Sequence, residues 1–341
     1  MRVSFFFLLL SSVISLESFS QDLFWKAQLF PFFDNVEFSN SEYKIPQTMS
    51  GIQVIPEIGL KWDSVHLIGT GVNLLHEFGS SEPVDKLYLT AYYEFNRKPF
   101  RFLMGSFPRE NVLDKYPRIF FQDSISYYRP NINGIFWEIR SQDDYFNVWL
   151  DWTTQVSQTV RESFFMGFSG RFNAGVLYFR HFGYMFHFAG TLDPLYNEAL
   201  HDNGLFLTSA GIDLSGKTIL DVLDINAGWA TGVERARADK NGWFVNNGLL
   251  IETRVGYKSI GILNSLYLGE GQMTFYADHL NDLYWGDPIY RAGNYNRSDF
   301  YINFIRSKNV NLNLTYSLHF AEGRMYHEQF LKVSVNLNNL N

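Results

Sequence analysis

Alternation of apolar and polar side chains near the end of the chain is the feature that most limits its fold. Across residues 309–320 the even positions are Val, Leu, Leu, Tyr, Leu and Phe, and the odd positions are Asn, Asn, Asn, Thr, Ser and His. Residues 328–338 repeat the pattern. A period of two predicts a β-strand with one dry face. If the dry face meets lipid, the strands must close into a barrel, because an open edge leaves backbone groups unpaired in hydrocarbon.

The first twenty residues have the pattern of a secretory signal peptide. Arg2 is followed by an apolar run over residues 3–16, and Ser18 and Ser20 form a small-x-small cleavage signal before Gln21. The apolar run is shorter than the roughly 20 residues of a spanning helix, so a membrane anchor is disfavoured. We expect a signal peptide at 1–20 and one barrel domain at 21–341.

Composition narrows the class of protein further. The 33 Phe, 20 Tyr and 8 Trp suit the aromatic girdles of a membrane barrel, whose polar lumen also accounts for a mean hydropathy of only -0.14. The absence of cysteine excludes disulfides, thiolate chemistry and a lipid-modified N-terminal Cys. A net charge of -7 disfavours nucleic acid as a partner.

Segments with strand-like patterning recur along the whole mature region. The predicted strands are 23–32, 51–62, 65–77, 86–96, 99–105, 132–141, 144–153, 163–172, 175–188, 204–215, 217–229, 244–258, 260–269, 299–306, 309–320 and 328–338. Short turns such as 215–216 alternate with long links such as 106–131, 270–298 and 321–327. This order predicts an all-β fold: a transmembrane antiparallel β-barrel of about 16 strands, with short periplasmic turns and long external loops. A soluble β-sandwich or lipocalin-like fold is the alternative.

With these sixteen segments and alternating links, the chain resembles a sixteen-stranded bacterial outer-membrane porin. The resemblance covers the architecture of the mature region and no specific motif, and it departs at the end, where Leu340 and Asn341 replace the usual terminal aromatic residue. It implies location in the outer membrane and a water-filled channel for passive diffusion of small hydrophilic solutes. The expected partners are outer-membrane lipid, those solutes, and either a homotrimer or partner proteins.

In the porins that the chain resembles, the third external loop narrows the pore. The corresponding link is 106–131, and its charges are the predicted pore constriction: Arg109, Glu110, Asp114, Lys115, Arg118, Asp123 and Arg129. Opposed charges across a constriction would sort solutes by charge. The simpler interpretation is a solvated external loop.

Charged residues on the polar faces of the strands are expected to line the lumen. The predicted wall consists of Glu57, Glu94, Glu138, Arg140, Asp151, Arg171, Asp213, Asp224, Glu252 and Arg254, to which Lys61 and Lys332 add two bases. The near balance of signs argues against a dedicated anion channel, which would need rings of Arg and Lys. Residues near turns, such as Lys61 and Arg140, could equally lie at the rim.

Four tyrosines suggest a sharper alternative. Tyr88, Tyr92, Tyr127 and Tyr128 could form a track for stacking sugars, which would make the protein a sugar-selective porin, although an interfacial girdle explains most barrel tyrosines more simply.

The sequence offers little support for an enzyme, a cofactor or a metal site. Residues 167–170 lack the spacing of a nucleophile elbow, and His319 beside Ser317 is more simply a residue of the wall. Asp278, His279, Asp282, Asp287 and Asp299 do not match a calcium loop, and these acids are expected to be solvated. We therefore expect no enzymatic activity and no cofactor. The main alternative to a diffusion porin is a non-conducting accessory barrel subunit of an outer-membrane protein assembly.

Overall fold

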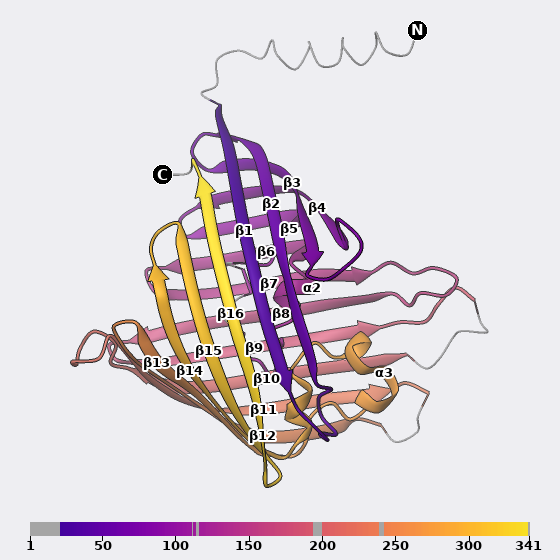
Figure 1. Ribbon diagram of the computed structural model, residues 1–341. Helices are drawn as coiled ribbons and strands as arrows, with labels where there is room; N and C mark the ends of the chain where they lie inside the picture. Colours follow the sequence, from indigo (N-terminus) through magenta and orange to yellow (C-terminus); the bar gives the residue numbers. More distant parts are fainter. Residues whose placement is uncertain (1–20, 111, 114–115, 194–199, 239–241, 340–341) are drawn as a thin grey trace.

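Sixteen antiparallel strands close into one barrel in the computed structural model of the chain (Figure 1). The structure describes residues 21–339 apart from 111, 114–115, 194–199 and 239–241. The predicted signal peptide therefore lies outside the described residues. The fold class expected from the sequence is confirmed, because each strand pairs with its sequence neighbour and β1 pairs with β16.

The strands vary in length from 9 to 16 residues. They are β1 (Asp22–Glu37), β2 (Gln47–Trp62), β3 (His66–Glu77), β4 (Lys86–Arg97), β5 (Phe100–Pro108), β6 (Asn131–Ser141), β7 (Asp144–Thr154), β8 (Ser163–Ala174), β9 (Leu177–Phe188), β10 (His201–Asp213), β11 (Val222–Ala236), β12 (Phe244–Tyr257), β13 (Ile260–Gly269), β14 (Asn294–Arg306), β15 (Val310–Ala321) and β16 (Arg324–Asn338). Within the described residues, three short helices lie in the links: α2 (Ile125–Tyr128), α3 (Tyr276–Leu283) and the 3-10 helix η2 (Pro288–Arg291). None of the helices among the described residues is long and apolar enough to cross a membrane.

Both ends of the barrel sequence lie at the same end of the barrel (Figure 1). The backbone N–H of Trp25, near the start of β1, donates to Oδ1 of Asn339 at 2.8 Å. Most of the short turns lie at this end and most of the long loops at the other, which are the periplasmic and external ends of an outer-membrane barrel.

Two links differ from the prediction. The link expected at 321–327 is a tight turn of Glu322 and Gly323, both with positive φ (50° and 78°), and the glycine adopts that conformation without steric cost. Conversely, the turn expected at 215–216 is an eight-residue link, 214–221, so that β11 begins at Val222.

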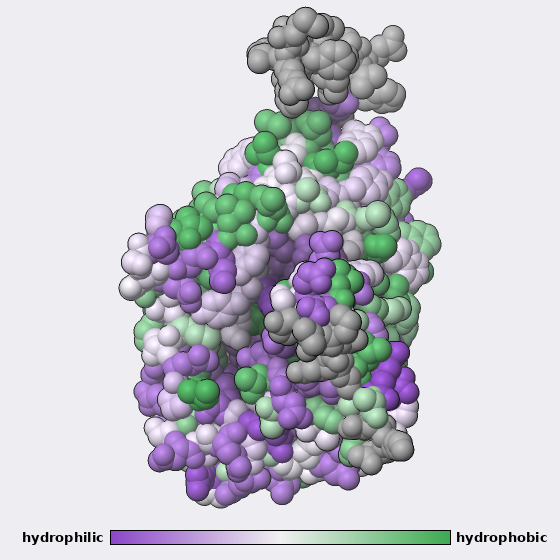
Figure 2. Space-filling model, turned by 90° about the vertical axis from the view of Figure 1, so that its right-hand side faces the viewer, coloured by the Kyte–Doolittle hydropathy of each residue, from purple (hydrophilic) through white to green (hydrophobic). Residues whose placement is uncertain are grey.

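The outer wall carries large apolar side chains that have no protein partner to cover them. Examples are Ile58, Leu89, Met166 and Trp229, which are 55–66% exposed. Such a continuous apolar band is stable only against lipid. Figure 2 shows hydrophobic side chains gathered in patches on the upper part of one face, and hydrophilic side chains lining a hollow near its middle.

Candidate functional site

The loop between β5 and β6, here called L3 (residues 109–130), lies inside the barrel. Its ends are tied together by the backbone hydrogen bond from Arg109 N to Pro130 O at 2.7 Å, and its middle residue Ile119 is fully buried. The loop between β13 and β14, called L7 (residues 270–293), packs on L3. Gln122 N donates to Trp285 O at 2.8 Å, and Asp287 N donates to Arg118 O at 2.9 Å. The two loops together form a single unit, the loop plug.

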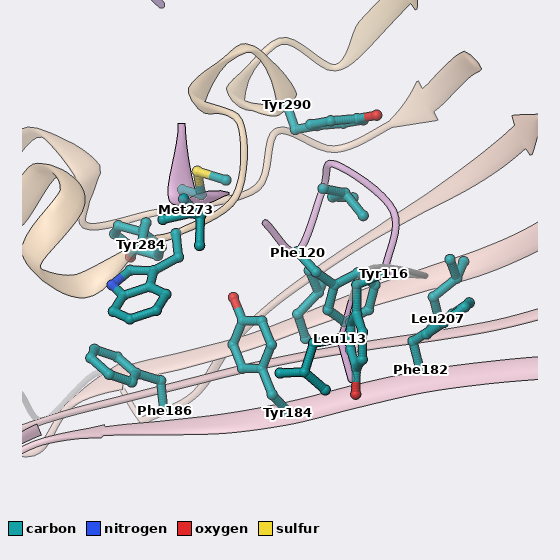
Figure 3. Close-up of a cluster of buried hydrophobic side chains, with 14 of the residues drawn as sticks. Leu113, Tyr116, Phe120, Phe182, Tyr184, Phe186, Leu207, Met273, Tyr284 and Tyr290 are labelled. Carbon is teal, nitrogen blue, oxygen red and sulfur yellow. The ribbon is translucent and has the colours of Figure 1, made fainter. Parts of the chain in front are cut away.

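Aromatic side chains attach the loop plug to the barrel wall. Three side chains of β9 point into the barrel toward the loop plug: Phe182, Tyr184 and Phe186 (Figure 3). They face Leu113, Tyr116 and Phe120 of L3, and Met273 and Tyr284 of L7. The ring centroids of Tyr116 and Phe182 are 5.0 Å apart, and those of Phe165 and Trp285 are 4.8 Å apart. These distances are those of packed aromatic pairs. The lumen at this level is therefore filled by a hydrophobic core.

Two cavities lie beside and below the loop plug. One, of about 520 Å³, is lined by L3 and by the walls of β1, β2 and β12. The other, of about 670 Å³, reaches the periplasmic turn at Gln142 and Asp143. Arg180 and Arg254 line both cavities, so the two spaces adjoin.

A network of buried charges joins the loop plug to β14 and β16. Arg297, only 2% exposed, lies at its centre: its nitrogens are 2.6 Å from Asp299, 3.3 Å from Glu328 and 3.6 Å from Asp123. Arg118 of L3 reaches both Asp123, at 2.7 Å, and Asp299, at 3.0 Å. Charged side chains of the loop and of the wall thus form ion pairs with one another, and Arg297 neutralises several carboxylates at once.

Two loop residues of this network have shifted pKa values: Asp123 of L3, and Lys44 of the loop between β1 and β2, which pairs with Asp287 and Glu328. Burial acts to raise the pKa of Asp123, but Arg118, Lys332 and Arg297 outweigh it and hold that pKa well below its usual range. Burial acts to lower the pKa of Lys44, but Asp287 and Glu328 outweigh it and raise that pKa above its usual value. Both side chains therefore remain charged and keep the loops fastened to the wall.

The predicted constriction residues have structural partners. Arg109 contacts Asp151 of β7 at 2.5 Å, Glu110 accepts from Gln28 at 2.9 Å, and Arg129 lies 5.3 Å from the ring of Trp285. Arg118 and Asp123 belong to the buried network described above. Asp114 and Lys115 lie outside the described residues.

All ten predicted wall residues are placed on the inner face of their strands, and most are paired across it. The pairs and hydrogen bonds are Glu57 with Tyr92, Glu94 with Arg101, Glu138 with Arg140, Asp151 with Arg109, Arg171 with Asp213, Asp224 with Tyr178, and Glu252 with Arg180. Arg254 lines both cavities. Whether these residues act on a permeating solute stays a prediction.

The four tyrosines of the suggested sugar track make contacts within the protein. Tyr127 is fully buried and stacks on Phe32 with ring centroids 4.1 Å apart. The hydroxyl of Tyr128 donates to Glu77, and that of Tyr88 donates to the carbonyl of Tyr128. The expectation of solvated acids in the late loop is wrong for Asp287 and Asp299, which are 2% and 3% exposed. No group of three metal-ligating side chains occurs among the described residues.

Ser317 and His319 are both fully buried on the inner face of β15 and have other partners. Ser317 Oγ donates to Asp299 at 2.6 Å. His319 Nδ1 lies 2.7 Å from the hydroxyl of Tyr295, and its Nε2 lies 3.1 Å from Glu328. This histidine is therefore enclosed in the buried network, away from the lipid-facing wall.

A second polar group, which the sequence analysis missed, lies on the outer face at the external rim. It joins β16, β1, β2 and β15 and is called the rim cluster: Asn35, Glu37, Thr48, Tyr316, His327 and Gln329. These residues alternate with buried neighbours and so face outward, on a wall whose exposed side chains are mainly apolar. Only the alternation of each strand could have found them, because four separate segments contribute.

Hydrogen bonds connect the rim cluster. Asn35 Nδ2 donates to Glu37 at 2.7 Å and to Gln329 Oε1 at 2.6 Å, and Thr48 Oγ1 donates to Asn35 Oδ1 at 2.7 Å. The hydroxyl of Tyr316 lies 2.6 Å from His327 Nδ1. His327 is also the cross-strand partner of Glu37, which places imidazole and carboxylate side by side.

Comparison with protein families adds a decisive finding. A family model described as lipid A 3'-O-deacylase-type matches residues 15–338. The chain belongs to the lipid A 3'-O-deacylase-type family. The prediction that the protein is not an enzyme is therefore wrong, because deacylases are enzymes. It failed because it rested on contiguous motifs, and catalytic groups that come together only in the fold leave none in the sequence.

Solved structures support the barrel fold alone. A loop-deletion mutant of OmpT, an outer-membrane protein of Vibrio cholerae, aligns with a TM-score of 0.56 at 9% identity, covering 93% of this chain and 100% of that one. A triple mutant of the Rhodopseudomonas blastica porin aligns with a TM-score of 0.51 at 8% identity, again covering 93% and 100%. No curated protein sequence matches the chain. The predicted outer-membrane location is confirmed, and the resemblance to porins holds for the fold.

We predict that the buried network stabilises the protein far more than the exposed pairs of the wall do. Arg297→Met removes the buried cation that Asp299, Glu328 and Asp123 share and should lower the free energy of unfolding by roughly 3–5 kcal/mol. The matched control is Arg171→Gln, whose pair with Asp213 is about one-third exposed and should contribute only about 0–1 kcal/mol. Urea unfolding in lipid vesicles measures both. Equal losses in the two variants would contradict a special role for the buried network.

Proposed function

We propose that the protein is an outer-membrane hydrolase that removes an ester-linked acyl chain from lipid A, and that the rim cluster is its active site. Membership of the family is the observation that carries this proposal. The position of the rim cluster supports it, because an acyl ester of a membrane lipid lies at the boundary between headgroups and hydrocarbon. Only the outward face of the wall meets that boundary.

The hydrogen bonds of the rim cluster suit ester hydrolysis. With His327 Nδ1–H donating to the Tyr316 oxygen, Nε2 keeps the lone pair that a general base needs. His327 takes a proton from a water molecule whose oxygen attacks the ester carbonyl. The bond from the carbonyl carbon to the sugar oxygen then breaks, and the imidazolium returns the proton to that leaving oxygen. The products are a free fatty acid and the sugar hydroxyl, so the atoms balance.

Neighbouring groups stabilise the charges that develop. Glu37, opposite His327 across the strand pair, favours the imidazolium form during the reaction. Gln329 accepts from Asn35 through Oε1, which leaves its amide N–H groups as donors toward the carbonyl oxygen. Thr48 fixes the orientation of Asn35 through the hydrogen bond to Oδ1. The set thus contains a base, its positioning groups and a donor for the oxyanion.

A water-filled diffusion channel, the function predicted from the sequence, is the second candidate. The long external loops, polar inner wall and adjoining cavities favour it, whereas the aromatic and ionic contacts of the loop plug weigh against an open path. The finer porin function therefore stays a prediction, as do assembly into a homotrimer and a role as an accessory subunit.

We predict that His327→Asn abolishes lipid A deacylation while leaving the barrel folded. Loss of a general base typically slows a reaction by about 10²–10⁴-fold. The measurement is mass spectrometry of lipid A incubated with the purified protein, which reports the mass of the lost acyl chain.

The control for that experiment is His66→Asn. His66 also faces outward and also has Nδ1 near a tyrosine hydroxyl, that of Tyr93 at 2.8 Å, but it lies beside the short periplasmic turn of β2 and β3. Its replacement should leave deacylation unchanged. Full activity in His327→Asn would refute the assignment of the rim cluster.

We also predict that the purified barrel shows no stable open steps in a planar bilayer. A variant lacking residues 272–291 of L7 should conduct, because it removes half of the loop plug. Folding of both proteins is checked by heat-dependent mobility in gels. Large, stable conductance of the intact protein would restore the diffusion-channel hypothesis.

A further inference from the structure

A cationic group lies on the outer wall about half-way around the barrel from the rim cluster. It consists of His187 of β9, Asp202 of β10, Arg235 of β11 and Arg237 just beyond it, here called the arginine cluster. His187, Asp202 and Arg235 are cross-strand partners, and their positions alternate with buried, inward-facing residues. All lie near the external ends of their strands, at headgroup level.

A single carboxylate organises the arginine cluster. Asp202 is buried and accepts three hydrogen bonds: one from Arg235 Nε at 2.8 Å, and two from Arg237 Nε and Nη2, also at 2.8 Å each. His187 Nδ1 lies 3.2 Å from the same group. The two arginine side chains are 34% and 42% exposed, whereas Asp202 is only 8% exposed. The negative charge is therefore covered, and the cationic tips face outward.

Among its described residues the arginine cluster has an excess of positive charge. Two guanidinium groups surround one carboxylate, and Arg161 and Glu162, just before β8, add one charge of each sign. Arg235 is also held in place by Trp243, whose ring lies 4.4 Å from the guanidinium carbon. A fixed guanidinium with outward N–H groups is suited to bind a phosphate.

Aromatic side chains adjoin the arginine cluster on the outer wall. Phe164 is the cross-strand partner of His187, with ring centroids 5.2 Å apart, and its ring lies 4.9 Å from that of Trp152. Trp229, which is 57% exposed, lies on the same face of β11 as Arg235 and six residues nearer the periplasmic end. Such side chains contact acyl chains and the glycerol or sugar region of a lipid. Cationic groups with apolar rings beside and below them together match a phosphorylated lipid.

We infer that the arginine cluster binds the phosphorylated headgroup of a lipid A molecule in the outer leaflet, as a site separate from the rim cluster. The inference rests on the proposed function in one respect, the choice of lipid A as the lipid. The site takes no part in cleavage, because the barrel separates it from His327. It holds the protein in a leaflet made of its own substrate.

The test measures lipid binding to the detergent-solubilised full chain by native mass spectrometry. The His327→Asn background prevents turnover of the probe. The probes are bisphosphorylated lipid A, dephosphorylated lipid A and inorganic phosphate. We expect Arg235→Gln with Arg237→Gln to weaken binding of bisphosphorylated lipid A at one site by about tenfold or more, since two charge-assisted hydrogen-bonding groups are lost.

Two further variants separate binding from structure. Asp202→Asn keeps both arginines and removes the negative charge that competes with a phosphate for them, so this variant should bind lipid A at least as tightly as the parent. Loss of binding in Asp202→Asn would mean that the cluster has only a structural role, and it would overturn the inference. Arg171→Gln removes an arginine from the lumen and should leave the binding of lipid A unchanged. Unchanged binding in the double arginine variant would overturn the inference, as would equal binding of dephosphorylated lipid A or of inorganic phosphate alone.

The outcome is independent of catalysis. With His327 intact, the double arginine variant should still cleave lipid A. If the wild-type protein cleaves none, the proposed function fails, while phosphate-dependent binding at the arginine cluster still supports this inference.

Discussion

Backbone hydrogen bonding in hydrocarbon is the constraint on which the rest of the structure depends. Every strand must be paired on both edges, and the pairing of β1 with β16 completes the circle. Once the barrel is closed, the position of a residue along its strand decides whether its side chain meets lipid or lumen. A polar residue on the outer wall then has only its outward neighbours as partners. This is why Asn35 finds its hydrogen bonds in Thr48, Glu37 and Gln329.

The same alternation directs charged side chains into the lumen, where their burial must be compensated. Inward-facing charges such as Arg297 and Asp299 would be expensive if left alone, and L3 and L7 supply the remaining partners. The aromatic contacts of Tyr116 with β9 then fill the space between L3 and that part of the wall. Where the loop plug packs on β9, the interior resembles the core of a globular protein and gives those strands a rigid support.

Strand number, barrel closure and the inward direction of the wall charges followed from period-two patterning, because that pattern is local. The Glu322–Gly323 turn was missed because its strands continue to the last residue before it, and Glu is an unusual residue at positive φ. The burial of Asp287 was missed because its partners lie on other elements: Lys44 is distant in the sequence, and Arg297, ten residues on, belongs to β14. The rim cluster was missed for a further reason. On a face expected to be apolar, polar residues near strand ends resemble ordinary turn residues until the register brings them together.

The depth of the two outward clusters follows from electrostatics. A charge on the lipid face of a barrel costs roughly 2–4 kcal/mol at the middle of the bilayer but only about 0–1 kcal/mol near its surface. His327 and Arg235 lie at the external ends of their strands, where that cost is small and water is within reach. An acyl ester of the outer leaflet lies at this same depth, as does the phosphorylated headgroup just above it. In the functions proposed for the two clusters, water, base, ester and anion meet in a narrow ring around the barrel. Both clusters lie in that ring, and the loop plug is left to support the wall.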